Sequence, residues 1–308
     1  MKMSKKKWLS YGVPVALSAV ILVVSGFSVS AGTSGYEAYK SALKNSEKIS
    51  SVTTNFQLSI TDNGSSVLDA KANVKLDEEG EGTNADFAIH SGTDSRQLQV
   101  YHQGDQVVIK NSAQDTYYTL DLDKKKESAE RKEHGDWEVP EEIEQVIDAL
   151  VGNLKQQISL EEGADGKKDV SLHMEGNQLP PIVNAVGSLL VKHGVKHKDS
   201  DVSDIPSSSF KEQLFGGEFD AALPQLTDDI RIEAVNLDAT INGDNQLERQ
   251  TLEIDIAGKD AAGAAHEITV AFTAQFSDFN NTIVDEIDLE GKKVEAIDTK
   301  AWKERKQH

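Results

Sequence analysis

The stretch that decides the fold runs from Val52 to Asp77 and reads VTTNFQLSITDNGSSVLDAKANVKLD. In its first half, the residues that share one side of an extended chain are Val52, Thr54, Phe56, Leu58 and Ile60. This alternation with polar residues predicts a strand with one buried face. Asp62-Asn63-Gly64 is a strong turn signal, after which Leu68, Ala70, Ala72, Val74 and Leu76 repeat the alternation. The stretch therefore predicts an antiparallel hairpin.

The same pattern continues on both sides of a long middle segment. A first strand block, 52–123, reads as a meander of about six strands with one polar side. A second block, 229–290, contains IRIEAVNLDATI, LERQTLEIDIAG and HEITVAFTAQF, in which Ile268, Phe272 and Phe276 share a face. The two blocks could form the flanks of one sheet or two small sheets.

Helical spacing occurs before and between the strand blocks. Tyr36, Tyr39, Leu43 and Ile49 fall roughly on one face of a helix over 36–49. A helical block, 138–226, carries apolar residues at helical spacing after Pro140 and again after Pro180-Pro181. The order helix, strands, helices, strands shows no βαβ alternation. We therefore predict an α+β fold: a strongly curved antiparallel sheet, an incomplete barrel, with helices packed on its concave side.

The first 31 residues carry a targeting pattern. Lys5-Lys6-Lys7 precedes an apolar run, Val13–Val24, and Val29-Ser30-Ala31 places small residues where a signal peptidase reads. The span from Trp8 to Ala31 is also long enough to cross ~30 Å of hydrocarbon. Residues 1–31 are thus a signal peptide or a single transmembrane anchor, and 32–298 an extracytoplasmic domain with a tail at 299–308. The protein is then anchored in the cell membrane by 8–31 or secreted after cleavage near Ala31.

Composition excludes several classes of function. The formal net charge of −20 repels phosphate backbones, so we expect no nucleic-acid partner. The absence of Cys rules out disulfides, thiol catalysis and thiolate metal sites.

Candidate catalytic and metal-binding residues have simpler explanations. Acid pairs such as Glu78-Glu79, Glu141-Glu142, Glu161-Glu162 and Asp228-Asp229 could serve glycosidic cleavage, but acidic composition alone produces them. His193 and His197 could share a helix face and bind zinc with Asp199 or Asp201, yet Gly194 weakens that helix. DNGSS, NGDNQ and DGKKD lack the spacing of calcium loops and read as turns. No nucleophile or phosphate-loop motif occurs. We predict no enzyme activity, no metal and no cofactor.

Two segments resemble a known group of proteins. GYEAYKSALKNSEKISSVTTNFQLSITDNGSSVLDAKANVKLD is similar to the start of the LolA/LppX-like exported carriers, a fold group that includes regulators of the RseB type. LERQTLEIDIAGKDAAGAAHEITVAFTAQFSDFNNTIVDEIDL resembles the second strand block of many exported proteins of Gram-positive bacteria. The resemblance covers about Gly35–Asp123 and Ile230–Leu289, and it implies a concave apolar cavity for an acyl chain, a lipoprotein tail or a peptide. There is no lipobox cysteine, and no catalytic residue can be carried over.

These patterns predict a non-catalytic binding module for a hydrophobic ligand or a lipoprotein-like partner at the membrane surface. The predicted cavity lining is Tyr39, Phe56, Leu58, Phe87, Ile147, Leu150, Leu189 and Phe272. The same residues could instead fill a core, which sequence cannot distinguish from a cavity. The alternative function is a membrane-tethered sensor or regulatory ectodomain that acts through a membrane protein partner.

Overall fold

A computed structural model describes residues 34–46, 48–78, 80, 82–121, 157–180 and 224–297. The predicted leader at 1–31, the tail at 299–308 and most of the predicted helical block lie outside these residues. Within the described part, no helix has both the length and the apolar character needed to span a membrane.

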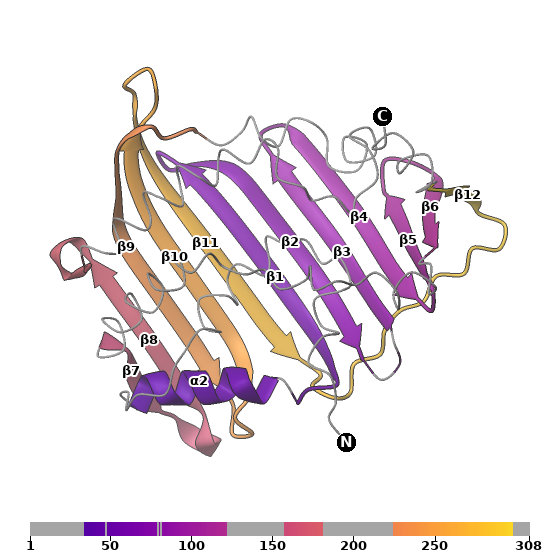
Figure 1. Cartoon of the computed structure of the whole chain (residues 1–308), viewed down its shortest axis with the longest axis horizontal. Helices are drawn as coiled ribbons and strands as arrows, with labels where there is room; N and C mark the ends of the chain where they lie inside the picture. The colour runs from indigo at the N-terminus through magenta and orange to yellow at the C-terminus, as the bar shows by residue number, and fades with distance from the viewer. Residues whose placement is uncertain are drawn as a thin grey trace, which may run out of the picture.

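Twelve strands form one sheet, in the order β12-β6-β5-β4-β3-β2-β1-β11-β10-β9-β8-β7 (Figure 1). Neighbouring strands are antiparallel, except that β12 runs parallel to β6. The strands are β1 (Ser51–Asp62), β2 (Ser65–Asp77), β3 (Gly82–Ser91), β4 (Asp94–Gln103), β5 (Gln106–Asn111), β6 (Thr116–Asp121), β7 (Ser159–Glu162), β8 (Lys168–Glu175), β9 (Asp228–Ile241), β10 (Leu247–Lys259), β11 (Ala265–Ser277) and β12 (Lys293–Ala296). The helix α2 (Ser34–Ser46) precedes them, and the short 3-10 helices η2 (Ala164–Gly166) and η3 (Gly176–Gln178) flank β8.

Pairing of β1 with β11 joins the two strand blocks into one sheet. Phe56 lies opposite Ala274, and Leu58 lies opposite Phe272, in a ladder of ten antiparallel pairs. Of the two arrangements that the sequence left open, the structure therefore has the single sheet.

The predicted α+β fold, an incomplete barrel with helices packed on its concave side, is wrong. The described residues are dominated by one open sheet, and their one α-helix, α2, packs mainly on the β7–β10 end. The sheet does not close because β7 and β12 each pair with a single strand. The helical spacing that favoured an α+β fold lies mainly in residues 122–156 and 181–223, outside the described part.

The first hairpin has the turn that its sequence predicts. Asn63 and Gly64 have φ angles of 48° and 76°, as both central residues of a type I′ turn require. The Asn63 side chain also bonds to β11: its Nδ2 donates to the Ala265 carbonyl at 3.3 Å, and its Oδ1 accepts from the Glu267 N–H at 3.1 Å. The turn thus helps to hold β1 in register with β11.

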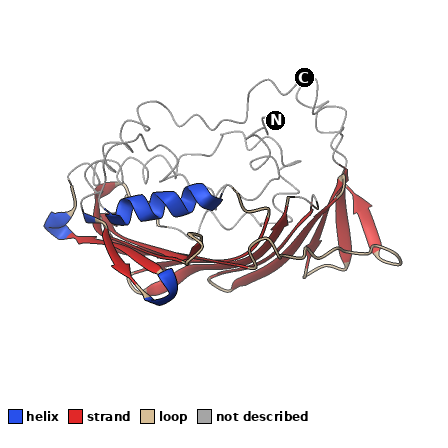
Figure 2. Cartoon of the chain, turned by 90° about the horizontal axis from the view of Figure 1, so that it is seen from below, coloured by secondary structure: helices blue, strands red, loops and turns tan. Residues whose placement is uncertain are grey.

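The helix α2 packs on one face of the curved sheet, and Figure 2 shows it on the concave side. Tyr36 and Tyr39 are both buried, which confirms that they share the packed face of the helix. Tyr39 and Ala42 join a core cluster with Val170, Ala239, Ile241 and Leu247. The concave face, defined here as the side of the sheet that carries α2, is therefore the apolar one, and the opposite side is the outer face.

Candidate functional site

An apolar row of side chains crosses the concave face from β3 to β8. Paired positions on seven successive strands give the row Ile89, Ala70, Leu58, Phe272, Leu252, Leu237 and Leu172. Six steps between strands, at ~4.8 Å each, make the row about 29 Å long. This apolar row is the longest uninterrupted feature of the face, and it is continued on β4 by Arg96, the residue opposite Ile89.

The predicted cavity residues fall into three groups. Phe56, Leu58 and Phe272 lie together on β1 and β11, with 5.9 Å between the Phe56 and Phe272 ring centroids. Phe87 lies on the same face two strands away, separated from Phe56 by Ala72. Tyr39 lies apart from them, on the sheet-facing side of α2, where burial raises the pKa of its hydroxyl. Ile147, Leu150 and Leu189 lie outside the described residues.

Burial along the concave face is uneven. The buried clusters formed by described residues all lie on the half of the sheet from β1 through β11 to β8, under α2 and Leu226. Phe272 is only 7% exposed, whereas Phe56, Leu58 and Phe87 are half-buried. Phe56, Leu58 and Phe87 therefore keep apolar surface that is not covered fully, although Val74, Ala85 and Leu98 on the same face are buried.

Small side chains alternate with aromatic ones at the centre of this face. Ala72 lies between Phe56 and Phe87, and Ala274 lies on the other side of Phe56. Alanine fills less volume than its aromatic neighbours, so the surface is uneven rather than filled to one level. Such a surface suits contact with an apolar molecule.

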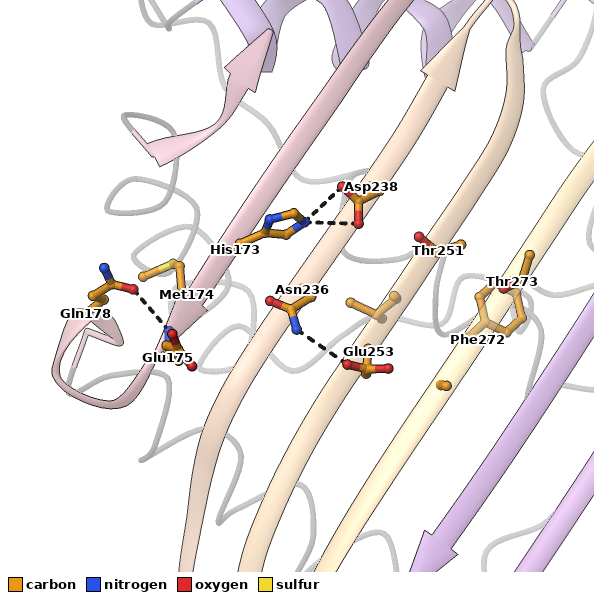
Figure 3. Close-up of a pocket in the computed structure, with 12 residues that line it drawn as sticks. His173, Met174, Glu175, Gln178, Asn236, Asp238, Thr251, Glu253, Phe272 and Thr273 are labelled. Carbon is orange, nitrogen blue, oxygen red and sulfur yellow. Dashed lines mark hydrogen bonds and ion pairs between the residues drawn. The ribbon is translucent and has the colours of Figure 1, made fainter. Parts of the chain in front are cut away.

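A polar hollow of about 470 Å³ lies over β8–β11 and η3 (Figure 3). Its lining is His173, Met174, Glu175, Gln178, Asn236, Asp238, Thr251, Leu252, Glu253, Ala271, Phe272 and Thr273. His173 Nε2 lies 2.9 and 3.0 Å from the two carboxylate oxygens of Asp238, and Asn236 Nδ2 donates to Glu253 Oε1 at 3.4 Å. The side chains of His173 and Asp238 are 59% and 53% exposed, so the hollow holds a solvated hydrogen-bonding surface rather than a closed site.

His266 forms a polar cluster at the end of the concave face. Its Nδ1 lies 2.9 Å from Asp62 Oδ2, and its Nε2 lies 3.7 Å from Asp260 Oδ2. The hydrogen bond with Asp62 is the main reason that the pKa of His266 is raised. Hydrogen bonds from the Ala264 and Ala262 N–H groups help to lower the pKa of Asp260. The two carboxylates therefore favour the protonated form of His266.

No group of three or more His, Asp or Glu side chains in the described ranges has the arrangement of a metal site. The proposed pair His193 and His197 lies outside those ranges. The sequence predicts turns rather than calcium loops at DNGSS, NGDNQ and DGKKD. Positive φ angles typical of tight turns occur in all three, at residues 63–64, 245 and 165–166.

Sequence reasoning missed the hollow and the His266 cluster. His173 and Asp238 are 65 residues apart, and Asp62 and His266 are 204 residues apart. Each pair forms because separate strands pair in register, and neither His has a local motif around it. The one available signal was a polar residue at a position that alternation assigns to the apolar face, which holds for Asp62 and His266.

Comparisons with known proteins do not assign the chain to a family. No protein-family profile matches it, and neither does any curated protein. Among solved structures, a porin-like protein from Bacteroides uniformis is similar over 74% of this chain and 97% of its own, with 10% identity and a TM-score of 0.21. A similarity at that level identifies neither a fold family nor a function, so the LolA/LppX-like resemblance stays a prediction.

Proposed function

We propose that the protein is a non-catalytic, extracytoplasmic module that binds a hydrophobic ligand at the membrane surface. The observation that carries this proposal is the row of apolar side chains that crosses seven strands and is about 29 Å long. Its residues on β1, β2 and β3, Leu58, Ala70 and Ile89, are only half-buried. An acyl chain laid along Leu58 and Ala70 would remove this surface from water. Burial of apolar area is worth roughly 25 cal/mol per Å².

The composition of the face supports an amphiphile rather than a purely apolar molecule. The row is continued by Arg96, which is half-buried on β4 directly opposite Ile89. A guanidinium offers planar, paired donors that suit a carboxylate or phosphate. The proposed ligand is therefore a long acyl chain with an anionic head at Arg96. The predicted signal peptide or membrane anchor, residues 1–31, would bring the domain to a membrane that supplies such molecules.

Two tryptophan substitutions on β2 provide the test. Ala72 lies between Phe56 and Phe87 on the concave face, and its neighbour Lys71 is exposed on the outer face. Binding of a long-chain fatty acid carrying an anthroyloxy fluorophore is measured by titration. Ala72→Trp fills the proposed ligand site and should raise Kd by about tenfold or more, whereas Lys71→Trp should leave Kd unchanged.

Arg96→Met should weaken binding of the fatty acid more than binding of the matching long-chain alcohol. Circular dichroism and the urea midpoint establish that each variant is folded. Absence of saturable binding to the unmodified chain, or equal binding by the Ala72→Trp and Lys71→Trp variants, would contradict the proposal.

A further inference from the structure

Residues 278–297, here called the strap, cross the outer face of the sheet; a stretch without helix or strand, 282–289, lies between turns at 279–281 and 290–291 and leads into β12. The strap leaves the end of β11, passes strands β1 to β5 and ends as β12 beside β6; Figure 1 shows it as the yellow coil between β11 and β12. Its contacts identify the face that it covers. Thr53, Lys75 and Asn84 occupy paired positions on β1, β2 and β3. Alternation along the strands places all three on the face of the sheet that does not carry Phe56.

The sheet binds the middle of the strap mainly through its backbone. Asn84 Oδ1 accepts a hydrogen bond from the Asp285 N–H at 2.9 Å. Gln103 makes a pair of bonds to one residue: its Oε1 accepts from the Ile287 N–H at 2.9 Å, and its Nε2 donates to the Ile287 carbonyl at 3.0 Å. The Asn84 side chain is buried, at 1% exposed. Amide side chains that satisfy a backbone in this way recognise an extended chain of almost any sequence.

Two side-chain contacts add a preference to this backbone recognition. Lys75 Nζ lies 2.7 Å from Asp285 Oδ2, so an acidic residue is favoured at that position. Gly82 has no side chain, and a Cβ there would lie 3.3 Å from Val284 Cγ1. Lys75, Asn84 and Gln103 thus form a track on the outer face. The track fits an extended segment with an acidic residue two positions before the residue that Gln103 holds.

The ends of the strap differ from its middle. Asp278 and Asn280, at its start, have φ angles of 53° and 57°, which non-glycine residues rarely adopt. Ile283 is 82% exposed, and β12 holds only four residues, all exposed. Both ends are nevertheless anchored by polar contacts, because the Asn280 N–H donates to the Ser51 carbonyl at 2.7 Å and the Ile297 N–H donates to the Thr119 carbonyl at 2.7 Å. The strap is thus held by hydrogen bonds along its length, and Ile283 and β12 add little apolar burial.

We propose that the track formed by Lys75, Asn84 and Gln103 is a binding site for an extended peptide, and that the strap is its displaceable intramolecular ligand. The partner is a protein segment in extended conformation with an acidic residue two positions before the residue that Gln103 holds. Because a tethered segment acts at a high effective concentration, the strap occupies the track until a partner of sufficient affinity competes for it.

Proline substitutions in the strap test this proposal while leaving the track intact. Asp285→Pro combined with Ile287→Pro removes both N–H donors that the track accepts. Glu286→Pro is the matched control, because no described residue bonds to the Glu286 N–H. The probe is a fluorescein-labelled synthetic peptide of residues 278–297, added to the full chain and followed by fluorescence anisotropy.

The double proline variant should bind the peptide saturably, at least about tenfold more tightly than the unmodified chain and the Glu286→Pro control do. Gln103→Leu added to the double variant should abolish most of that binding. Equal peptide binding by the double variant and the control would overturn the proposal, and so would the absence of any effect of Gln103→Leu.

A second measurement applies if the double variant does not fold. Hydrogen exchange of the Asp285 and Ile287 amides is measured in the unmodified chain with and without a large excess of unlabelled peptide. Displacement of the strap should accelerate exchange at both amides, because they lose their acceptors on Asn84 and Gln103. Unchanged exchange at high peptide concentration would overturn the proposal.

Discussion

The hydroxyl of Tyr39 on α2 donates a hydrogen bond to Oε1 of Gln250 on β10, with 2.7 Å between the two oxygens and both side chains buried. The bond joins two residues that are 211 positions apart in the chain. It supplies a polar partner for Gln250, the one buried polar residue of β10, which lies beside the apolar cluster under α2. The bond therefore fixes where α2 lies on the sheet.

Removal of this hydroxyl should leave Gln250 buried without its partner. Tyr39→Phe is expected to lower the free energy of unfolding by about 1–3 kcal/mol, the cost of an unsatisfied buried polar group. The double variant Tyr39→Phe, Gln250→Leu should recover a large part of that loss, because neither side chain then needs a partner. Urea unfolding of the four proteins measures the coupling; simple additivity of the two substitutions would contradict the assigned bond.

The first turn of α2 should tolerate no side chain where it meets β7. A Cβ at Gly35 would lie 2.6 Å from the Ser159 carbonyl oxygen, whereas a Cβ at Gly163 would have its nearest neighbour at 3.6 Å. Gly35→Ala should destabilise the protein by about 1–3 kcal/mol, and Gly163→Ala should change stability by less than about 0.5 kcal/mol. Thermal unfolding compares the two, and equal effects would mean that α2 does not approach β7 so closely.

The His266 cluster should make stability depend on pH. The pKa of His266 is raised in the folded protein, chiefly by its hydrogen bond with Asp62. Its contribution to stability is therefore fully present below the unfolded value of about 6.5 and is lost as pH rises through the raised folded value. The difference in urea midpoint between the unmodified chain and His266→Gln should shrink from pH 5 to pH 9.

Asp62→Asn removes the acceptor and should abolish the same pH-dependent part of the stability. A midpoint difference that is constant across this pH range, for either variant, would contradict the assigned hydrogen bond.

A disulfide should form between the strap and β1. The hydroxyl oxygens of Thr53 and Thr282 lie 3.1 Å apart, and the chain contains no other cysteine that could interfere. The double variant Thr53→Cys, Thr282→Cys should oxidise under mild conditions and gain about 2–4 kcal/mol of stability relative to its reduced form. Mass spectrometry detects the bond, and urea unfolding with and without reductant measures the gain. Free thiols after oxidation would show that the strap does not pass Thr53.

Local patterns predicted the strands and their buried sides. Alternation around Phe56 and Leu58 identified the apolar face of β1, and Asn63-Gly64 identified the turn that follows. Helical spacing identified Tyr36 and Tyr39 as the buried face of α2. These features depend on residues close together in the chain, so periodicity and turn chemistry are enough to find them.

Long-range pairing could not be predicted in the same way. The ladder between β1 and β11 joins residues about 200 positions apart, and nothing in either strand specifies the other as its partner. The strap reaches the sheet through long-range contacts of the same kind, since Asn84 and Asp285 are 201 positions apart. Its contacts bury Asn84 on a face where alternation predicted solvent-exposed polar residues, because the amide serves the backbone of Asp285.

The most direct test of the proposed ligand is the material that the protein carries when it is purified. Residues 32–308 are expressed for export, isolated without detergent, extracted with organic solvent and examined by mass spectrometry, with the Ala72→Trp variant treated in parallel. The proposed function predicts a long-chain anionic amphiphile in an amount comparable to the protein, and much less of it on the variant. Equal traces of apolar material on both proteins would contradict a ligand site on the concave face.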